Sequence, residues 1–188
     1  RSARVGIVVP CHNEAERLDV AAFVALARRP GVRIRFVDDG STDATAEVLA
    51  GLLHEAPESV RLQRLTDNVG KAEAVRLGLL AELADAELVG FLDADLATPP
   101  DDFVRLVDAA TDDANLLVVL ASRVGLLGHD IARTRRRHYL GRVFATAASV
   151  VARLRVYDTQ NGAKLFRAGP EIIEALSQPF SSRWAFDV

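Results

Sequence analysis

Short apolar runs alternate along this chain with longer segments in which apolar residues recur at helical spacing. The short runs predict strands, because proline, glycine or polar turn residues bound them. They cover residues 5–10, 32–37, 60–63, 88–92 and 116–121. A regular exchange of strands and helices is typical of an α/β fold with three layers, in which helices cover both faces of a mostly parallel sheet.

The first helix is expected directly after the strand at 5–10. Asn13 can cap it, with Glu16 three residues later as in a capping box, and Leu18, Ala22 and Ala25 would form its apolar stripe. A second helix is expected to end near residue 53, a third to begin after residues 67–70, and a fourth to open at the proline pair 99–100. An apolar helix is expected to reach about residue 154, before a polar loop and a short strand within residues 158–166.

Polar clusters follow four of the predicted strands or the turns beside them. They lie at residues 10–14, 38–40, 68–71 and 93–95. In open parallel sheets, ligands bind outside the carboxyl ends of the strands. The sequence therefore predicts one binding site at that edge, built from these four clusters.

Asp93 and Asp95 follow the apolar run at 88–92 and stand two residues apart. Residues at this spacing face the same side of an extended chain. Two carboxylates so placed are hard oxygen ligands suited to Mg²⁺ or Mn²⁺, which keep bound waters and take substrate phosphates. A solvated aspartate turn is the alternative, but emergence from a buried strand favours the metal site.

The other clusters also have a plain structural reading. Asp38 and Asp39 could accept hydrogen bonds from a nucleoside, while Ser41, Thr42 or Asp43 could simply cap a helix. Residues 68–71 open a helix, whose start and Lys71 would attract an anion. An arginine-rich stretch at 123–142 suits phosphates, although such a run is often a solvated helix face, and the apolar helix behind it could be core or rest on a membrane.

Bulk composition narrows the class of protein. The 188 residues fit one domain, 1–188, and a net charge of -3 gives no basic field for nucleic acid. One cysteine excludes an internal disulfide and favours a cytoplasmic, reducing compartment. No apolar run approaches the roughly 20 residues of a membrane span. The abrupt end at 185–188 leads us to expect that the chain is incomplete at its C-terminus.

Taken together, the segments at 8–14, 37–43, 68–71 and 92–95 resemble glycosyltransferase family 2. That resemblance implies the GT-A fold, a nucleotide-diphospho-sugar donor such as UDP-glucose or GDP-mannose, and inversion at the anomeric carbon. Residues 158–166 and 183–187 look like the dolichyl-phosphate glucosyltransferase and mannosyltransferase branch, with the glucosyl enzymes most similar. The implied acceptor is a polyprenyl phosphate at the cytoplasmic face of a membrane.

The resemblance also implies roles for individual residues. The nucleoside pocket would be lined by Pro10, Asn13, Glu14 and Asp38, with Asp39 beside them, and the donor would be bound by Asn68 and Lys71. Mg²⁺ or Mn²⁺ would be held by Asp93 and Asp95, and phosphates would be met by Arg123 and the arginines at 133–137, including Arg133 and Arg136. The sugar or acceptor would be faced by Gln160 and Lys164, and the acceptor side would be closed by Trp184 and Asp187. Asp187 would be the base if the acceptor were a hydroxyl.

Three positions depart from the family pattern. His12 stands where an aromatic residue is frequent, Asn161 replaces a frequent cysteine, and Ala97 replaces a glutamine of the mannosyl enzymes, which makes a mannosyltransferase less favoured.

Three alternative functions stay open at this point. An aspartyl phosphatase would place the motif at 93–95 after its first strand, a sugar-nucleotide pyrophosphorylase would need a glycine-rich loop at 10–14, and a non-catalytic nucleotide-sugar-binding domain would share the same pocket.

Overall fold

In the computed structural model, which describes residues 3–121, 162–180 and 182–183, six strands form one sheet in the order β3-β2-β1-β4-β6-β5. The strands are β1 (Val5–Cys11), β2 (Val32–Asp39), β3 (Val60–Leu65), β4 (Leu88–Leu92), β5 (Val118–Leu120) and β6 (Ala163–Arg167). The pairs β1·β2, β1·β4 and β2·β3 are parallel. The expected α/β fold with a mostly parallel sheet is confirmed.

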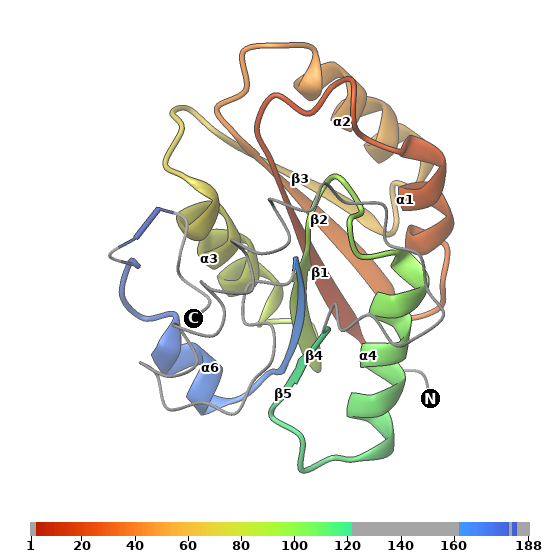
Figure 1. Ribbon diagram of the computed structural model, residues 1–188, viewed down its shortest axis with the longest axis vertical. Helices are drawn as coiled ribbons and strands as arrows, with labels where there is room; N and C mark the ends of the chain where they lie inside the picture. The colour runs from red at the N-terminus through yellow and green to blue at the C-terminus, as the bar shows by residue number, and fades with distance from the viewer. Residues whose placement is uncertain (1–2, 122–161, 181, 184–188) are drawn as a thin grey trace, which may run out of the picture.

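Helices cover both faces of this sheet, as Figure 1 shows. They are α1 (Val20–Ala27), α2 (Thr45–Glu55), α3 (Lys71–Glu82), α4 (Pro100–Asp112) and α6 (Pro170–Ala175). One buried cluster joins α1, α2 and α4 to the sheet, and a second joins α3 to the opposite face. The three-layer arrangement follows from these two separate cores.

Alternation along the strands divides their side chains between the two cores. In β1, Ile7 and Val9 belong to the cluster under α1, α2 and α4, while Val8 belongs to the cluster under α3. Both sets are buried, which explains why these strands appear as continuous apolar runs in the sequence. Phe23 of α1 meets Phe36 of β2 edge to face, with ring centroids 5.1 Å apart.

Strand β6 runs against the direction of its neighbours. It pairs antiparallel with β4 on one side and with β5 on the other. The strand comes late in the sequence but lies inside the sheet, between β4 and β5. Its first residues therefore reach the same edge as the end of β4, because Leu92 is paired with Ala163.

The expected start of the first helix is wrong. Helix α1 begins at Val20, and its cap is Asp19, whose carboxylate accepts a hydrogen bond from the Ala22 amide at 3.0 Å. Asn13 has a φ of 54° and lies in the loop before the helix. The apolar face is carried by Phe23, Leu26 and Ala27, while Ala25 of the predicted stripe is exposed.

The remaining expected elements agree with the structure to within a few residues. The strand at 88–92 has its predicted bounds, and α4 opens at Pro100 as expected. The predicted apolar helix near residues 140–154 lies outside the described residues. Within the described part of the chain, no helix is both long enough and apolar enough to cross a membrane.

Candidate functional site

A cleft of about 530 Å³ lies at the edge of the sheet where β1, β2 and β4 end. All four polar clusters expected at this edge contribute to it. The described residues that line it are Pro10, Cys11, His12, Glu14, Arg17, Asp39, Asn68, Gly70, Lys71, Asp93, Ala94, Asp95 and Arg183. Two further predicted residues, Asn13 and Asp38, are not among these lining residues and instead hold the loops around the cleft.

Asp39 holds the loop that forms one wall of the cleft. Its side chain is 3 % exposed, and its two carboxylate oxygens accept hydrogen bonds from the Val69 amide at 2.7 Å and the Gly70 amide at 2.9 Å. Its backbone oxygen lies 2.8 Å from His12 Nδ1. Asp39 thus ties the ends of β1 and β2 to the loop before α3.

Asn13 and Asp38 were expected in the nucleoside pocket, but neither is among the described residues that line the cleft. The Asn13 side chain accepts a hydrogen bond from the Thr42 amide at 2.8 Å. Asp38 is fully buried, accepts from the Ser41 amide at 3.0 Å and lies 3.4 Å from Arg64. Both side chains stabilise the turn after β2, and this turn supports the residues that line the cleft.

Glu14 and Arg17 line the cleft from the segment between β1 and α1. Arg17 donates to Glu14 Oε1 at 2.6 Å, while Glu14 Oε2 is buried without a hydrogen-bond partner among the described residues. Burial raises the pKa of Glu14 above its usual value, Arg17 opposes that rise, and the charge of Asp95 adds to it. A buried acceptor facing a cleft can receive an N–H or O–H from a ligand.

Asp93 and Asp95 lie in a turn rather than in an extended strand. Strand β4 ends at Leu92, and the Leu96 amide donates to the Asp93 carbonyl at 3.1 Å. Both residues still line the cleft. Their shared direction therefore comes from the turn after the strand, and the predicted alternation of an extended chain is not what places them.

The Asp93 carboxylate is tightly confined. Lys71 Nζ lies 2.6 Å from Asp93 Oδ1, and the Asp93 amide donates to the Gly162 carbonyl at 2.8 Å. A Cβ atom at Gly162 would lie 2.2 Å from Asp93 Oδ2, so only glycine leaves room for this carboxylate. The start of β6 and the start of α3 thus fix Asp93 from two sides.

The pair Asp93 and Asp95 fits a divalent cation that completes its coordination with other ligands. Among the described residues, no group of three or more histidine, cysteine or acidic side chains is arranged to hold a metal. Mg²⁺ is usually bound through one or two carboxylates together with waters and substrate phosphates. Two carboxylates on the wall of an open cleft meet that requirement, and Mn²⁺ accepts the same ligands.

Other predicted residues lie apart from the cleft or outside the described chain. Lys164 is 2 % exposed on β6, with its Nζ 5.8 Å from the centre of the Phe91 ring, and it is not among the described lining residues. Pro10, Asn68 and Lys71 do line the cleft. The predicted site residues outside the described ranges are Arg123, Arg133, Arg136, Gln160, Trp184 and Asp187.

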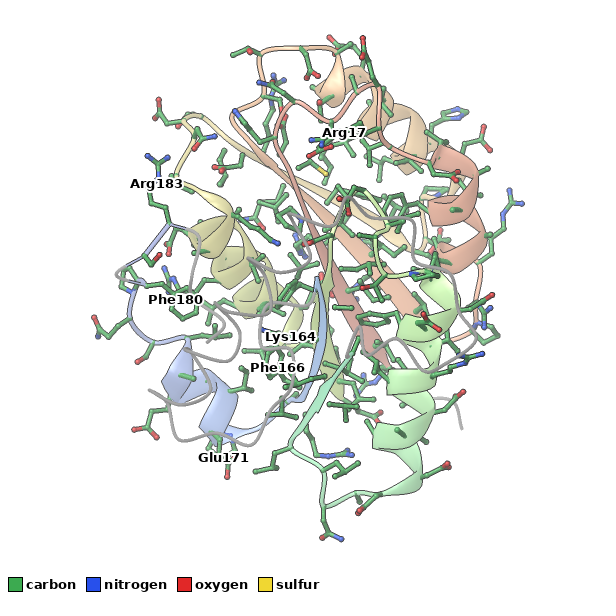
Figure 2. The ribbon with its side chains drawn as sticks, in the orientation of Figure 1. Arg17, Lys164, Phe166, Glu171, Phe180 and Arg183 are labelled. Carbon is green, nitrogen blue, oxygen red and sulfur yellow. The ribbon has the colours of Figure 1, made fainter. Side chains whose placement is uncertain are left out.

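Arg17 and Arg183 line the cleft, although no role was expected for either side chain. They lie on the segment that leads to α1 and beside the start of α3, respectively (Figure 2). Arg183 contacts Asn68, which is 115 positions away in the sequence. Such a contact leaves no local pattern, so only the folded chain reveals it.

Cys11 also borders the cleft but is not suited to act as a nucleophile. Its side chain is 1 % exposed, and its thiol lies 3.6 Å from the Val9 carbonyl. Burial, helped by the negative charges of Glu14 and Asp38, raises the pKa of the Cys11 thiol far above its usual range. The reactive thiolate is therefore strongly disfavoured.

Comparison with known proteins agrees with this geometry. A dolichyl-phosphate beta-glucosyltransferase of Trichomonas vaginalis is 33% identical over 96% of this chain and 56% of its own length. An undecaprenyl-phosphate 4-deoxy-4-formamido-L-arabinose transferase of Yersinia enterocolitica is 31% identical over 78% of this chain and 41% of its own length. The chain thus spans about half the length of these curated relatives.

Solved structures show the same fold. The glucosyl-3-phosphoglycerate synthase of Mycobacterium tuberculosis, in complex with Mn²⁺, UDP and phosphoglyceric acid, superposes with a TM-score of 0.63 at 21% identity, covering 88% of this chain and 56% of that one. The fold is therefore GT-A. Residues 6–171 match the family described as glycosyl transferase family 2, and the chain belongs to that family.

Proposed function

We propose that this domain transfers a hexose from a nucleoside diphosphate sugar, with a divalent cation, to a polyprenyl phosphate. The observation that carries the proposal is the convergence of Glu14, Lys71, Asp93 and Asp95 on one cleft at the carboxyl edge of the sheet. Membership of glycosyl transferase family 2 favours glycosyl transfer over a phosphatase that uses the aspartates at 93–95.

The charges in the cleft support the need for a cation. The described lining residues include four carboxylates, those of Glu14, Asp39, Asp93 and Asp95. They also include three cationic side chains, those of Arg17, Lys71 and Arg183. A diphosphate entering such a cleft would meet repulsion from the carboxylates, and a divalent cation between phosphate and aspartate would remove it.

In this proposal Asp93 and Asp95 hold Mg²⁺ or Mn²⁺ against the donor diphosphate. A cation held by these two carboxylates would supply positive charge to the leaving nucleoside diphosphate. Lys71, now beside Asp93, is close enough to contribute a second positive charge to the same group. Glu14 would accept a hydrogen bond from the donor through Oε2, which is buried and has no hydrogen-bond partner among the described residues.

A phosphate acceptor would make a general base unnecessary. The phosphate oxygen is already anionic near neutral pH, so its attack on the anomeric carbon requires no proton transfer. The attacking oxygen forms the new glycosidic bond as the bond to the diphosphate breaks, with inversion at that carbon. Asp187, the candidate base for a hydroxyl acceptor, lies outside the described residues.

The two relatives named above support the acceptor and the location. One is named for dolichyl phosphate and the other for undecaprenyl phosphate, and both are polyprenyl lipids. A lipid acceptor would bring the domain to a membrane surface. The single cysteine is in keeping with the cytoplasmic side of that membrane.

Thermal unfolding with a panel of nucleotide sugars tests the donor site. With Mn²⁺ and UDP-glucose or GDP-mannose at roughly 100 times Kd, the midpoint should rise by about 5 °C or more. EDTA should abolish the rise. Asp95→Asn should abolish it too, because one of the two cation ligands is lost, whereas Asp108→Asn, an exposed aspartate on α4, should keep it.

A rise that survives EDTA, or that Asp95→Asn retains in full, would rule out the metal site. The donor found in this way then serves in a transfer assay with polyprenyl phosphate and, as a matched acceptor, polyprenol. Labelled sugar should pass to the phosphate only. Equal transfer to polyprenol would contradict the phosphate acceptor.

A further inference from the structure

Helix α3 lacks a cap of its own at the point where it carries Lys71 into the cleft. Its N-cap residue is Gly70, which has no side chain and makes no side-chain cap hydrogen bond. The first amides of a helix need acceptors from elsewhere. Here the Ala72 amide donates to the backbone carbonyl of Arg183 at 3.0 Å, so a distant segment supplies the missing cap.

The Arg183 side chain binds the loop before the same helix. Its Nη2 donates to the Asn68 backbone oxygen and to Asn68 Oδ1, each at 2.6 Å. Hydrogen bonds from a charged donor are stronger than neutral ones. Asp39 holds the next two residues of this loop through their amides, so the loop is fixed from both sides.

The packing around Gly70 shows how close this contact is. Gly70 has a φ of 99°, and a Cβ atom added there would lie 2.9 Å from Arg183 Cβ. Glycine is therefore required both by the backbone conformation and by the approach of Arg183. Arg183 lies beside the start of α3 (Figure 2).

We propose that Arg183 is a positioning residue of the donor site, which holds the loop at 68–70 and the start of α3 so that Lys71 meets Asp93 and the donor. The inference rests on the proposed function for the identity of the ligand, but the clamp itself does not. Among the described residues, no carboxylate forms an ion pair with Arg183. Its positive charge at the cleft would therefore also favour an anionic donor.

The test compares Arg183→Met and Arg183→Lys with Arg4→Met, a matched control at the exposed Arg4–Glu87 pair. Amide hydrogen exchange at Val69, Gly70 and Ala72 reports the clamp without any ligand. Exchange there should be faster in Arg183→Met and intermediate in Arg183→Lys, because lysine keeps the charge but not the planar fork. Arg4→Met should leave it unchanged.

Donor affinity, measured by calorimetry with the nucleotide sugar that stabilises the wild-type protein, is the second readout. Arg183→Met should raise the donor Kd about 10- to 100-fold, the effect of losing hydrogen bonds from a charged group. Asn68→Ala should raise it less, because the backbone acceptor remains. The double variant should be no weaker than Arg183→Met alone, since the two residues act as one contact.

The two proposals fail in different ways. If the wild-type protein binds no nucleotide sugar, the proposed function is wrong, and hydrogen exchange still decides whether Arg183 is a clamp. Unchanged exchange at the three amides in Arg183→Met would overturn the clamp. Faster exchange with an unchanged donor Kd would overturn its link to the donor. If Arg183→Met does not fold, Asn68→Ala and Arg183→Lys carry the same comparison.

Discussion

At the scale of single residues, Glu14 is the side chain whose ionisation the fold opposes. Burial raises its pKa above the usual value of 4.5, although Arg17 partly offsets the effect. A carboxyl group with a raised pKa in the folded state contributes stability at low pH that is lost as the pH rises through that pKa. Glu14 is thus retained in the cleft at a cost to stability, as expected of a ligand-binding group.

Glu14→Gln should therefore stabilise the protein against heat above the usual glutamate pKa. The glutamine keeps the shape and an acceptor oxygen but has no charge to desolvate. The gain should shrink as the pH falls towards and below 4.5, where the wild-type carboxyl is protonated in both the folded and unfolded states. Thermal unfolding of both proteins between acidic and mildly alkaline pH checks this, and a gain that grows as the pH falls would contradict it.

Local sequence is a poor guide to individual polar contacts in this cleft. Asn13 and Glu16 have the spacing of a capping box, yet the Asn13 side chain bonds the Thr42 amide from a neighbouring loop. Asp93 and Asp95 were correctly expected at the end of a strand, but a turn sets their direction. The partner of Asn13 lies 29 positions away, where spacing carries no information, whereas the turn at Asp93 is local but breaks the alternation of an extended chain.

At the scale of secondary-structure elements, the position of α3 depends on the absence of a side chain. A Cβ atom at Gly78 would lie 2.5 Å from Val8 Cγ1 and 3.0 Å from Val37 Cγ2, and both valines are fully buried. The helix therefore lies close against β1 and β2. Gly51 in α2 offers a contrast, since nothing lies within 4 Å of its added Cβ.

The same substitution should therefore have opposite effects in the two helices. Gly78→Ala should lower the free energy of unfolding by about 1–3 kcal/mol, because the buried valines must move. Gly51→Ala should raise it by about 0.5–1 kcal/mol, since alanine favours the helix and meets no obstacle. Urea unfolding of both variants gives the comparison. Stabilisation by Gly78→Ala would show that α3 does not pack against the sheet as described.

The elements themselves could be largely predicted, because β1, β4 and most of β2 are buried on both faces and the turns carry glycine, proline or aspartate. The place of β6 could not. A short apolar run such as residues 163–167 has the same pattern whether it lies at an edge or between two strands, and whether it runs parallel or antiparallel. Only its pairing with β4 and β5 decides this.

At the scale of the whole molecule, charged groups lie at both ends of the sheet. Those at one end line the cleft, and those at the other end attach α3 to the sheet. At the end opposite the cleft, the buried Glu82 carboxylate of α3 accepts from Arg33 Nε at 2.7 Å and from Arg35 Nε at 2.8 Å. Both arginines belong to β2. This cluster fastens the end of α3 to the sheet, far along the helix from Lys71.

Glu82→Ala should therefore reduce stability without abolishing ligand binding. Arg35 would lose its counter-charge and Arg33 would keep only Asp85, 3.4 Å away, which should cost roughly 3 kcal/mol of unfolding free energy. Donor affinity of the folded protein should change little, because the cleft residues and Arg183 are untouched. Urea unfolding and calorimetry measure the two quantities. A large loss of donor affinity in a protein that remains folded would show that the two ends of α3 are coupled.

The late position of β6 has a consequence for synthesis on the ribosome. Among the described strands, β4 has β6 as its only partner on one side, and β5 pairs with β6 alone. While residues 163–167 are still inside the exit tunnel, a nascent chain that has already formed β1 to β4 therefore presents an unpaired strand edge to its surroundings. Such edges promote association between chains. Until β6 emerges, the nascent chain is therefore open to association through the unpaired edge of β4.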